Sequence, residues 1–195
     1  KKISNNQIEK FKKYIAHCRY GMINDKLPLK KFNFSKEIES KISMLSRGVD
    51  KRIFRKMKIN RSRLLKKYGI YNYEKIIFFC GRIHELKGAL FLSKIHNIIH
   101  SRGYQVVSIF AGQNLHGQKC LKIGGSRIKL LDYLNENELS KLYNLCDLFV
   151  FPSKFEIGPQ VVLEAKSCGA ISVVTPKGGG KRISANGIDG IIIND

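Results

Sequence analysis

The sequence predicts an α/β protein with a doubly wound parallel sheet, and three observations support this prediction. From about residue 75, short apolar runs alternate with stretches that have helical spacing. The runs are continuously apolar, as is typical of parallel strands that are buried on both faces. Several runs end at Gly or Pro, where turns are expected. Because crossovers between parallel strands are right-handed, this order favours an open, Rossmann-like sheet.

The individual elements follow in order along the chain. Strands are expected at 75–81, 105–111, 128–133, 147–151, 170–175 and 190–193. Helices are expected at 88–102, from Asn135 to Leu145, and at 159–167, with a short one after Gly178–Gly180. Asn135 and Glu138 have the spacing of a capping box, and Pro159 suits a first helical position. Residues 113–126 are rich in Gly and lack a clear period, so we expect an irregular connection there.

Two segments of different character divide the chain. Residues 1–40 look helical and basic and do not follow the strand–helix alternation, so we expect the tail of a preceding acceptor domain or a linker. Residues 41–195 are expected to form the Rossmann-like domain, with 41–45 as an edge or linker strand. A doubly wound sheet binds ligands beyond the carboxyl ends of its strands. The functional residues should therefore follow Gly81, Gly112, Tyr133, Phe151 and Thr175.

Composition excludes several classes of protein. No apolar run approaches the roughly 20 residues of a membrane-spanning helix, and residues 1–6 do not resemble a signal peptide. The five cysteines are odd in number and far apart, which argues against a disulfide framework or a structural zinc site. We therefore expect free thiols in the cytoplasm. No Asp/His cluster suits a metal, so no metal is expected.

Basic residues are concentrated in the first third of the chain. The net charge is +21, and residues 1–67 hold 21 Lys/Arg and 5 Asp/Glu, a net of +16. The densest part is 51–67, which contains no acidic residue. Such a stretch could contact an anionic membrane surface or a nucleic acid, or could be an ordinary solvated face. The sequence leaves these alternatives open.

The loop after the first expected strand carries two cations. Arg82 and Lys87 lie between Gly81 and the next helix. Arg offers a planar fork of donors, Lys offers a point charge, and a helix N-terminus adds free N–H groups. This arrangement suits a diphosphate, although the same residues would also fit a charged surface turn.

The loop after the fourth expected strand leads into a helix with two carboxylates. Glu156 precedes the helix, and Glu164 lies within it among Val and Ala residues, so we expect Glu164 to be partly buried. A buried carboxylate needs partners, and vicinal sugar hydroxyls can supply two hydrogen bonds to it. Structural roles for both carboxylates are the alternative.

Together these pieces resemble the carboxyl-terminal donor domain of GT-B-fold, family 4-type (group 1) retaining glycosyltransferases. The pieces, in order, are Arg47–Asp50 with Phe54, Gly81-Arg82, Lys87-Gly88, Phe110–Gly112, Leu139–Tyr143, Cys146–Leu148, Pro152-Ser153, Glu156, Glu164-Ala165, Cys168-Gly169, Gly179-Gly180, Gly187 and Gly190. The resemblance covers roughly residues 41–195.

The resemblance implies a role for each matching residue. Arg82 and Lys87 would hold the donor diphosphate and stabilise the departing nucleoside diphosphate, and Glu156 would contact the transferred sugar. Glu164 would bind the ribose hydroxyls, and Asp132-Tyr133 would lie near the base. Arg82, Lys87 and Glu156 are thus the catalytic candidates. The implied nucleotide-sugar site comprises Gly81, Arg82, Lys87, Asp132, Tyr133, Glu156, Gly158, Gln160, Val161 and Glu164.

The resemblance also implies the substrates and the setting. The donor would be a UDP- or GDP-linked sugar, and the acceptor a saccharide or a lipid-linked saccharide in polysaccharide or lipopolysaccharide biosynthesis. No further cofactor and no nucleic acid are expected, and the enzyme would be cytoplasmic, with 51–67 as an optional peripheral contact on the inner membrane face. Without the acceptor domain we expect no transfer.

One departure from the family pattern lies beside Glu156. Ile157, Gly158, Pro159 and Gln160 replace a stretch in which relatives have Gly, an aromatic residue, Gly and an aliphatic residue. Because Pro has no N–H, any phosphate contact made there in relatives is lost. Two alternatives remain: a polyanion-, nucleic-acid- or membrane-binding module, and another GT-B enzyme such as a sugar-nucleotide epimerase or a phosphorylase.

Overall fold

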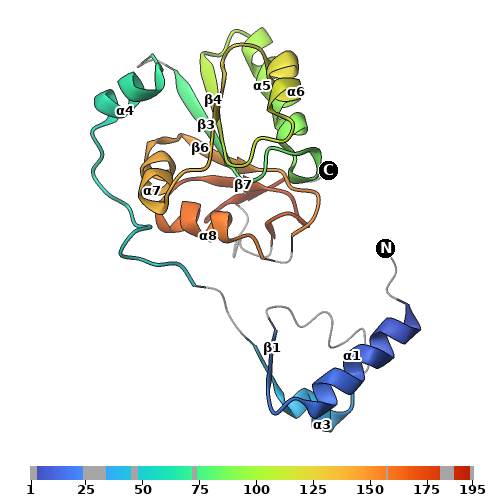
Figure 1. Cartoon of the computed structure of the whole chain (residues 1–195). Helices are drawn as coiled ribbons and strands as arrows, with labels where there is room; N and C mark the ends of the chain where they lie inside the picture. The colour runs from blue at the N-terminus through green and yellow to red at the C-terminus, as the bar shows by residue number, and fades with distance from the viewer. Residues whose placement is uncertain are drawn as a thin grey trace. The chain divides into compact units, whose positions relative to one another are not determined.

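The chain folds as two compact units, Lys1–Arg47 and Gly48–Asp195, which are described separately. A computed structural model describes residues 4–23, 34–44, 48–71, 74–156, 158–180 and 187–193 (Figure 1). In the smaller unit, Ser4 and Gln7 form a capping box that begins α1 (Asn5–His17). The short helix α3 (Lys36–Ser40) is capped by Ser35.

Two short strands of the smaller unit include residues that the sequence assigned to the next domain. Strand β1 (Gly21–Ile23) pairs in parallel with β2 (Ile42–Met44), and the Gly21 N–H also bonds the Lys41 carbonyl at 2.8 Å. These hydrogen bonds hold residues 41–44 in the smaller unit, whereas the expected Rossmann-like domain began at 41. The proposed link between this unit and an acceptor domain stays a prediction.

The larger unit contains a six-stranded parallel sheet. Its strands are β3 (Lys75–Cys80), β4 (Val106–Ala111), β5 (Ile128–Leu131), β6 (Leu148–Phe151), β7 (Ser172–Val174) and β8 (Ile191–Ile192). They lie in the order β5-β4-β3-β6-β7-β8, and every pairing is parallel. The chain moves outward from β3 to β5 and then returns to the other side of β3. This reversal between β3 and β6 confirms the predicted doubly wound fold and places its switch point there.

Helices cover both faces of this sheet. The helices are α4 (Arg61–Tyr68), the 3-10 turn η1 (Glu85–Lys87), α5 (Ala89–Ser101), α6 (Gly117–Gly124), α7 (Glu136–Leu145) and α8 (Gln160–Ser167). Helices α5 and α6 lie on one face, and α7 and α8 lie on the other (Figure 1). Asn135 caps α7, as predicted, because its side chain accepts the Glu138 N–H at 3.0 Å. Pro159 lies one position earlier than predicted, at the N-cap of α8.

Helix α6 was not predicted, and its glycines explain why. Gly117 and Gly124 stand at its two ends, where their lack of a side chain permits close packing. A Cβ atom on Gly124 would lie 2.2 Å from Cδ1 of Ile128, and one on Gly117 would lie 2.7 Å from Cδ1 of Leu130. Glycine here serves helix–strand packing rather than a loop, so the expectation of an irregular connection was wrong. The short helix expected after Gly180 falls on residues 181–186, outside the described part.

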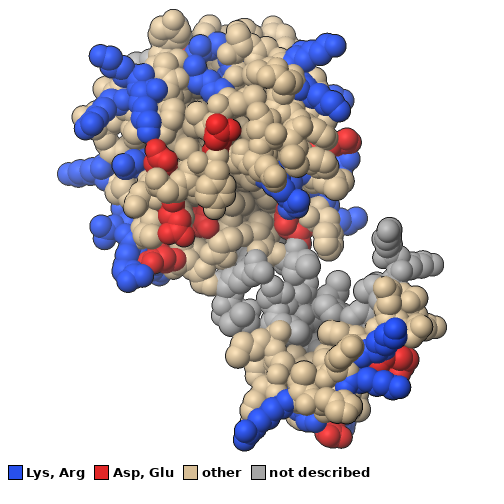
Figure 2. Space-filling view, viewed as in Figure 1, with Lys and Arg blue, Asp and Glu red and all other residues tan. Residues whose placement is uncertain are grey.

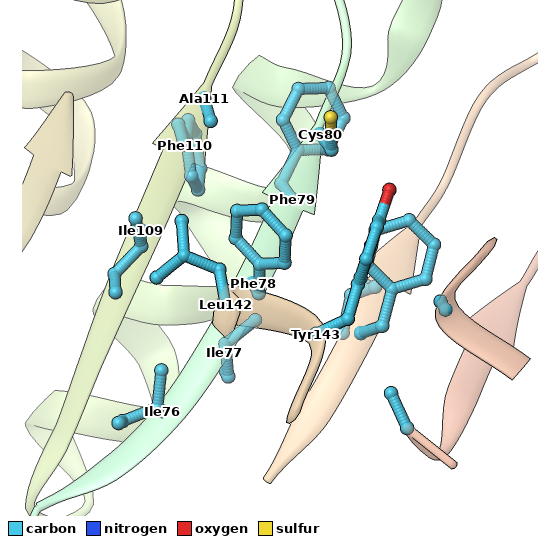
Figure 3. Packing of buried hydrophobic residues seen from close by; sticks show 14 of the residues in the cluster. Ile76, Ile77, Phe78, Phe79, Cys80, Ile109, Phe110, Ala111, Leu142 and Tyr143 are labelled. Carbon is cyan, nitrogen blue, oxygen red and sulfur yellow. The ribbon is translucent and has the colours of Figure 1, made fainter. Parts of the chain in front are cut away.

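Aromatic side chains from the sheet and from α7 form the centre of the core. Phe78, Phe79, Phe110, Phe149 and Tyr143 are each no more than 1% exposed. Tyr143 contacts Phe78 and Phe149 edge to face, with ring centroids 5.2 and 5.3 Å apart. Figure 3 shows these strands and Tyr143 packed together. The rigid packing fixes where β3, β6 and α7 end, and hence the shape of the carboxyl edge of the sheet.

The basic stretch 51–67 begins with a turn, and its first residues are bonded to α7 and α8. The carbonyls of Ile53 and Phe54 accept hydrogen bonds from Ser140 and Ser167, at 2.7 and 2.5 Å. Asn144 then donates to the Arg55 carbonyl at 3.0 Å. Phe54 is buried, while the cations of 51–58 are exposed: Lys51, Arg52, Arg55, Lys56 and Lys58. Lys and Arg side chains project around the larger unit in Figure 2.

Candidate functional site

A cavity of about 890 Å³ lies at the carboxyl edge of the larger unit's sheet. It lies where β3, β4 and β5 end, next to the switch point, and residues of α7 and α8 complete its wall. Of the residues predicted to form the nucleotide-sugar site, the ones that line it are Gly81, Arg82, Asp132, Tyr133, Val161 and Glu164. Of the loops predicted from strand ends, those that follow Gly81, Gly112 and Tyr133 thus converge on one cavity.

Two glycines keep the floor of this cavity open. Gly81 and Gly112 have φ angles of 147° and 130°, which side-chain-bearing residues rarely adopt. A Cβ atom on Gly112 would lie 2.4 Å from the Gly81 carbonyl oxygen. The two strand ends are joined by the Gly81 N–H, which donates to the Ala111 carbonyl at 2.9 Å. A ligand can therefore approach the backbone closely here.

Glu164 and Arg82 are charged groups of opposite sign in a cavity wall that also contains Asp132 and Glu136. Glu164, in the second turn of α8, is half-buried and accepts a hydrogen bond from the Tyr143 hydroxyl at 3.2 Å. Burial raises the pKa of the Glu164 carboxyl, while the Tyr143 hydrogen bond opposes this rise and the nearby Glu136 adds to it. Arg82 is exposed, and none of the ion pairs among the described residues involves it. Its guanidinium is therefore available to an anionic ligand.

Lys87 and Glu156 contact each other instead of lining the cavity. They form an ion pair in which both side chains are largely buried, at 22% and 16% exposed. Ser153 donates to the same Glu156 carboxylate at 3.0 Å, and the Lys154 N–H bonds the Leu86 carbonyl at 3.1 Å. These bonds join the loop after β3 to the loop after β6. The predicted diphosphate cation and the predicted sugar-binding carboxylate thus neutralise each other.

The remaining predicted positions also lie outside the cavity wall. Gly158 is half-buried, and the Gln160 side chain donates to the Gly48 carbonyl. Val161, one residue further along α8, does line the cavity. The roles of Gly158 and Gln160 in binding the nucleotide sugar stay predictions.

Several residues that line the cavity were not among the predicted site residues. They are Phe54, Cys80, Ala111, Gly112, Gln113, Asn114, Leu134, Glu136 and Leu139. Gln113 and Asn114 directly follow β4, so the same strand-end rule could have identified them. The Asn114 side chain accepts the N–H of Gly117, the first residue of α6, at 2.8 Å.

His84 has a local structural role next to the cavity. Its Nδ1 accepts the Leu86 N–H at 3.2 Å, and its ring stacks on His116 with centroids 4.4 Å apart. Within the described part of the chain, no three His, Cys, Asp or Glu side chains gather as a metal site would require.

Comparison with known protein families assigns this chain to one of them. The family "Glycosyl transferases group 1" matches residues 60–195 of the chain. The chain therefore belongs to the glycosyl transferases group 1 family. None of the helices described here is long and apolar enough to cross a membrane.

Individual relatives agree with this assignment. An uncharacterized glycosyltransferase of Methanocaldococcus jannaschii is 28% identical over 162 residues, covering 78% of this chain and 41% of the relative. A D-inositol 3-phosphate glycosyltransferase of Paenarthrobacter aurescens is 28% identical over 167 residues, covering 79% and 40%. The chain thus spans about two fifths of the length of these curated relatives.

A solved structure shows the same fold. The crystal structure of Anabaena HepE in complex with UDP-glucose matches with a TM-score of 0.74 at 20% identity, over 98% of this chain and 54% of that chain. The fold is that of GT-B glycosyltransferases, as the sequence predicted.

Proposed function

We propose that the larger unit is the donor-binding domain of a retaining glycosyltransferase and binds a nucleotide-diphosphate sugar in the cavity at its sheet's carboxyl edge. The observation that carries this proposal is that the wall of one cavity contains both a free guanidinium, that of Arg82, and a half-buried carboxylate, that of Glu164. A nucleotide-diphosphate sugar has a matching anionic centre and vicinal ribose hydroxyls. Family membership and the UDP-glucose held by HepE support the same choice.

Each residue of the site would have its own role in binding or catalysis. Arg82 binds the diphosphate and stabilises the negative charge that develops on the leaving nucleoside diphosphate. Such electrostatic stabilisation of the transition state is usually the largest contribution of an active site to the rate. Glu164 accepts the ribose hydroxyls, and the backbone at Asp132 and Tyr133 lies near the base. Lys87 joins Arg82 once the donor phosphate draws it from Glu156, and Glu156 is then free to accept hydroxyls of the transferred sugar.

Acceptor binding and the transfer step would need parts of the enzyme outside this unit. The acceptor would be a saccharide or lipid-linked saccharide, with the anomeric configuration retained, in polysaccharide or lipopolysaccharide assembly in the cytoplasm. UDP- and GDP-linked sugars are the proposed donors. The chain alone should bind donor and transfer nothing, because it spans about two fifths of its curated relatives.

Arg82→Ala tests the diphosphate contact. Loss of a charge-assisted hydrogen bond of about 1.5–3 kcal/mol should weaken binding of UDP or GDP about ten- to hundredfold. Uridine or guanosine, which lack phosphate, should bind equally to both proteins. Isothermal titration calorimetry measures this, with Arg102→Ala, at the end of α5, as the matched control. Equal diphosphate affinity in Arg82→Ala and the unaltered chain would remove Arg82 from the proposal.

We propose in addition that the exposed cations of 51–58 touch an anionic membrane surface. The hydrogen bonds to α7 and α8 hold the backbone of this segment, so its cations form a fixed face rather than a loose tail. Each Lys or Arg near such a surface contributes about 1 kcal/mol. Vesicles with anionic lipid should therefore co-sediment the chain at low salt, whereas neutral vesicles should not. Equal sedimentation with both would contradict this contact.

A further inference from the structure

Tyr143 lies directly behind the cavity without forming part of its wall. It is on α7 and only 1% exposed, so no ligand in the cavity can touch more than a trace of it. Phe54, Phe78 and Phe149 surround its ring edge to face, with centroid separations of 6.1, 5.2 and 5.3 Å. Such packing leaves the ring one orientation, and the position of its hydroxyl is fixed accordingly.

The Tyr143 hydroxyl lies at the base of the cavity between two residues that do line it. It donates to Oε2 of Glu164 at 3.2 Å, and it also interacts with the Cys80 thiol. In Figure 3 the hydroxyl oxygen points toward the end of the cluster where the Cys80 sulfur lies. An ionised carboxylate has about four acceptor positions, so one bond from behind leaves the others for a ligand in front.

We propose that Tyr143 is a positioning residue for Glu164, whose carboxylate it orients toward the cavity and keeps ionised for the ribose hydroxyls of the donor. This inference rests on the proposed function, since it assigns Tyr143 a role in that same donor site. A buried phenol suits this task because it donates a hydrogen bond to the carboxylate without carrying a charge itself. Burial raises the pKa of Tyr143 well above its ordinary value, so the hydroxyl keeps its proton throughout the neutral range.

Without this hydrogen bond, Glu164 would lose its main support as an anion. Burial and the nearby Glu136 both raise the pKa of the Glu164 carboxyl, and the Tyr143 hydrogen bond is the cause that lowers it. The other titratable groups around it are the Cys80 thiol from β3 and the Cys168 thiol after α8, with Arg82 and Asp132 elsewhere in the cavity wall. Burial raises the pKa of both thiols, so they stay neutral at neutral pH.

Tyr143→Phe tests the inference, because phenylalanine keeps the ring contacts and removes only the hydroxyl. Binding of UDP, GDP and ADP to the full chain would be followed by calorimetry from acid to alkaline pH, because burial raises the pKa of the Glu164 carboxyl. We expect affinity within about threefold of the unaltered chain at the alkaline end, and a loss of about tenfold or more at the acid end. The acid limb of the profile should therefore move to higher pH.

Ser140→Ala is the matched control on the same helix. Its buried hydroxyl bonds the Ile53 carbonyl at 2.7 Å and does not touch Glu164, so its removal should lower stability and leave the acid limb in place. A ¹³C NMR titration of the Glu164 carboxyl needs no ligand and should show the same order: unaltered chain and Ser140→Ala together, and Tyr143→Phe higher.

The outcomes separate the two proposals. If the unaltered chain binds none of the three nucleotides, the proposed function is wrong, and the inference about Tyr143, which rests on it, is wrong too. If it binds one of them and the acid limbs and NMR titrations of Tyr143→Phe and Ser140→Ala coincide, the inference alone is overturned. A limb and a titration that shift only in Tyr143→Phe establish the positioning role.

Discussion

Replacing Glu164 with glutamine is expected to weaken nucleotide diphosphate binding about ten- to hundredfold, because hydrogen bonds to a charged group contribute about 1.5–3 kcal/mol. Glutamine has nearly the same shape and can still accept the Tyr143 hydroxyl. It replaces one acceptor oxygen with an NH₂ group, which cannot accept a hydroxyl proton. Calorimetric titration of UDP and GDP measures the loss, with Glu138→Gln on the surface of α7 as the control.

The same substitution should stabilise the folded chain at neutral pH. Burial raises the pKa of Glu164 above its value in the unfolded chain, so ionisation costs folding free energy once the pH rises through the folded pKa. Glutamine removes that cost. Glu164→Gln should therefore raise the midpoint of thermal unfolding near pH 8 and leave it unchanged near pH 4, where both states carry a protonated carboxyl. A variant that loses both binding and stability at neutral pH would show a structural carboxylate instead of a ligand group.

Replacing Gly88 with alanine is expected to lower the free energy of unfolding by about 3 kcal/mol or more. Gly88 has a φ of 82° at the N-cap of α5, and a Cβ atom there would lie 2.1 Å from the Pro152 carbonyl oxygen. Because the obstacle is backbone, the loops after β3 and β6 would have to separate, and Lys87 would lose Glu156. Urea denaturation followed by circular dichroism measures the change.

Gly103→Ala is the control that isolates the clash. Gly103 has nearly the same φ, 86°, but a Cβ atom there would meet no atom within 4 Å. It should therefore lose only the conformational cost of about 1 kcal/mol. If the two variants are equally stable, the contact between the loops after β3 and β6 does not hold the edge of the sheet together.

The sequence predicted the sheet well because burial on both faces leaves a clear pattern. The run Lys75–Cys80 has apolar residues at five successive positions, and all five are buried in the structure. Helix α6 left no such pattern, since its packing depends on Gly117 and Gly124, residues that elsewhere indicate loops. Residues 41–44 were predicted to belong to the Rossmann-like domain but belong to the smaller unit. Their pairing with β1 depends on a segment outside the Rossmann-like pattern, so the sequence did not indicate it.

Candidate site residues that directly follow parallel strands could be predicted from the sequence. Contacts that depend on tertiary packing could not. Arg82, Asp132 and Tyr133 follow parallel strands, so topology alone brings them to one edge. The pairing of Lys87 with Glu156 and the support of Glu164 by Tyr143 join positions that are 69 and 21 residues apart. No local pattern encodes such contacts, because they depend on how two loops or two helices meet across the sheet.

The measurement that tests the donor-site assignment most directly is amide NMR mapping of the ¹⁵N-labelled chain during titration with UDP- and GDP-linked sugars. The cavity assignment predicts that one donor class shifts the amide signals of Gly81, Gly112, Tyr133 and Glu164 at concentrations that leave Arg61, Arg63, Lys66 and Lys67 unaffected. Shifts confined to the basic residues of 51–67, equal for every nucleotide and abolished by salt, would contradict it. They would instead favour a surface that binds polyanions without a nucleotide-sugar site.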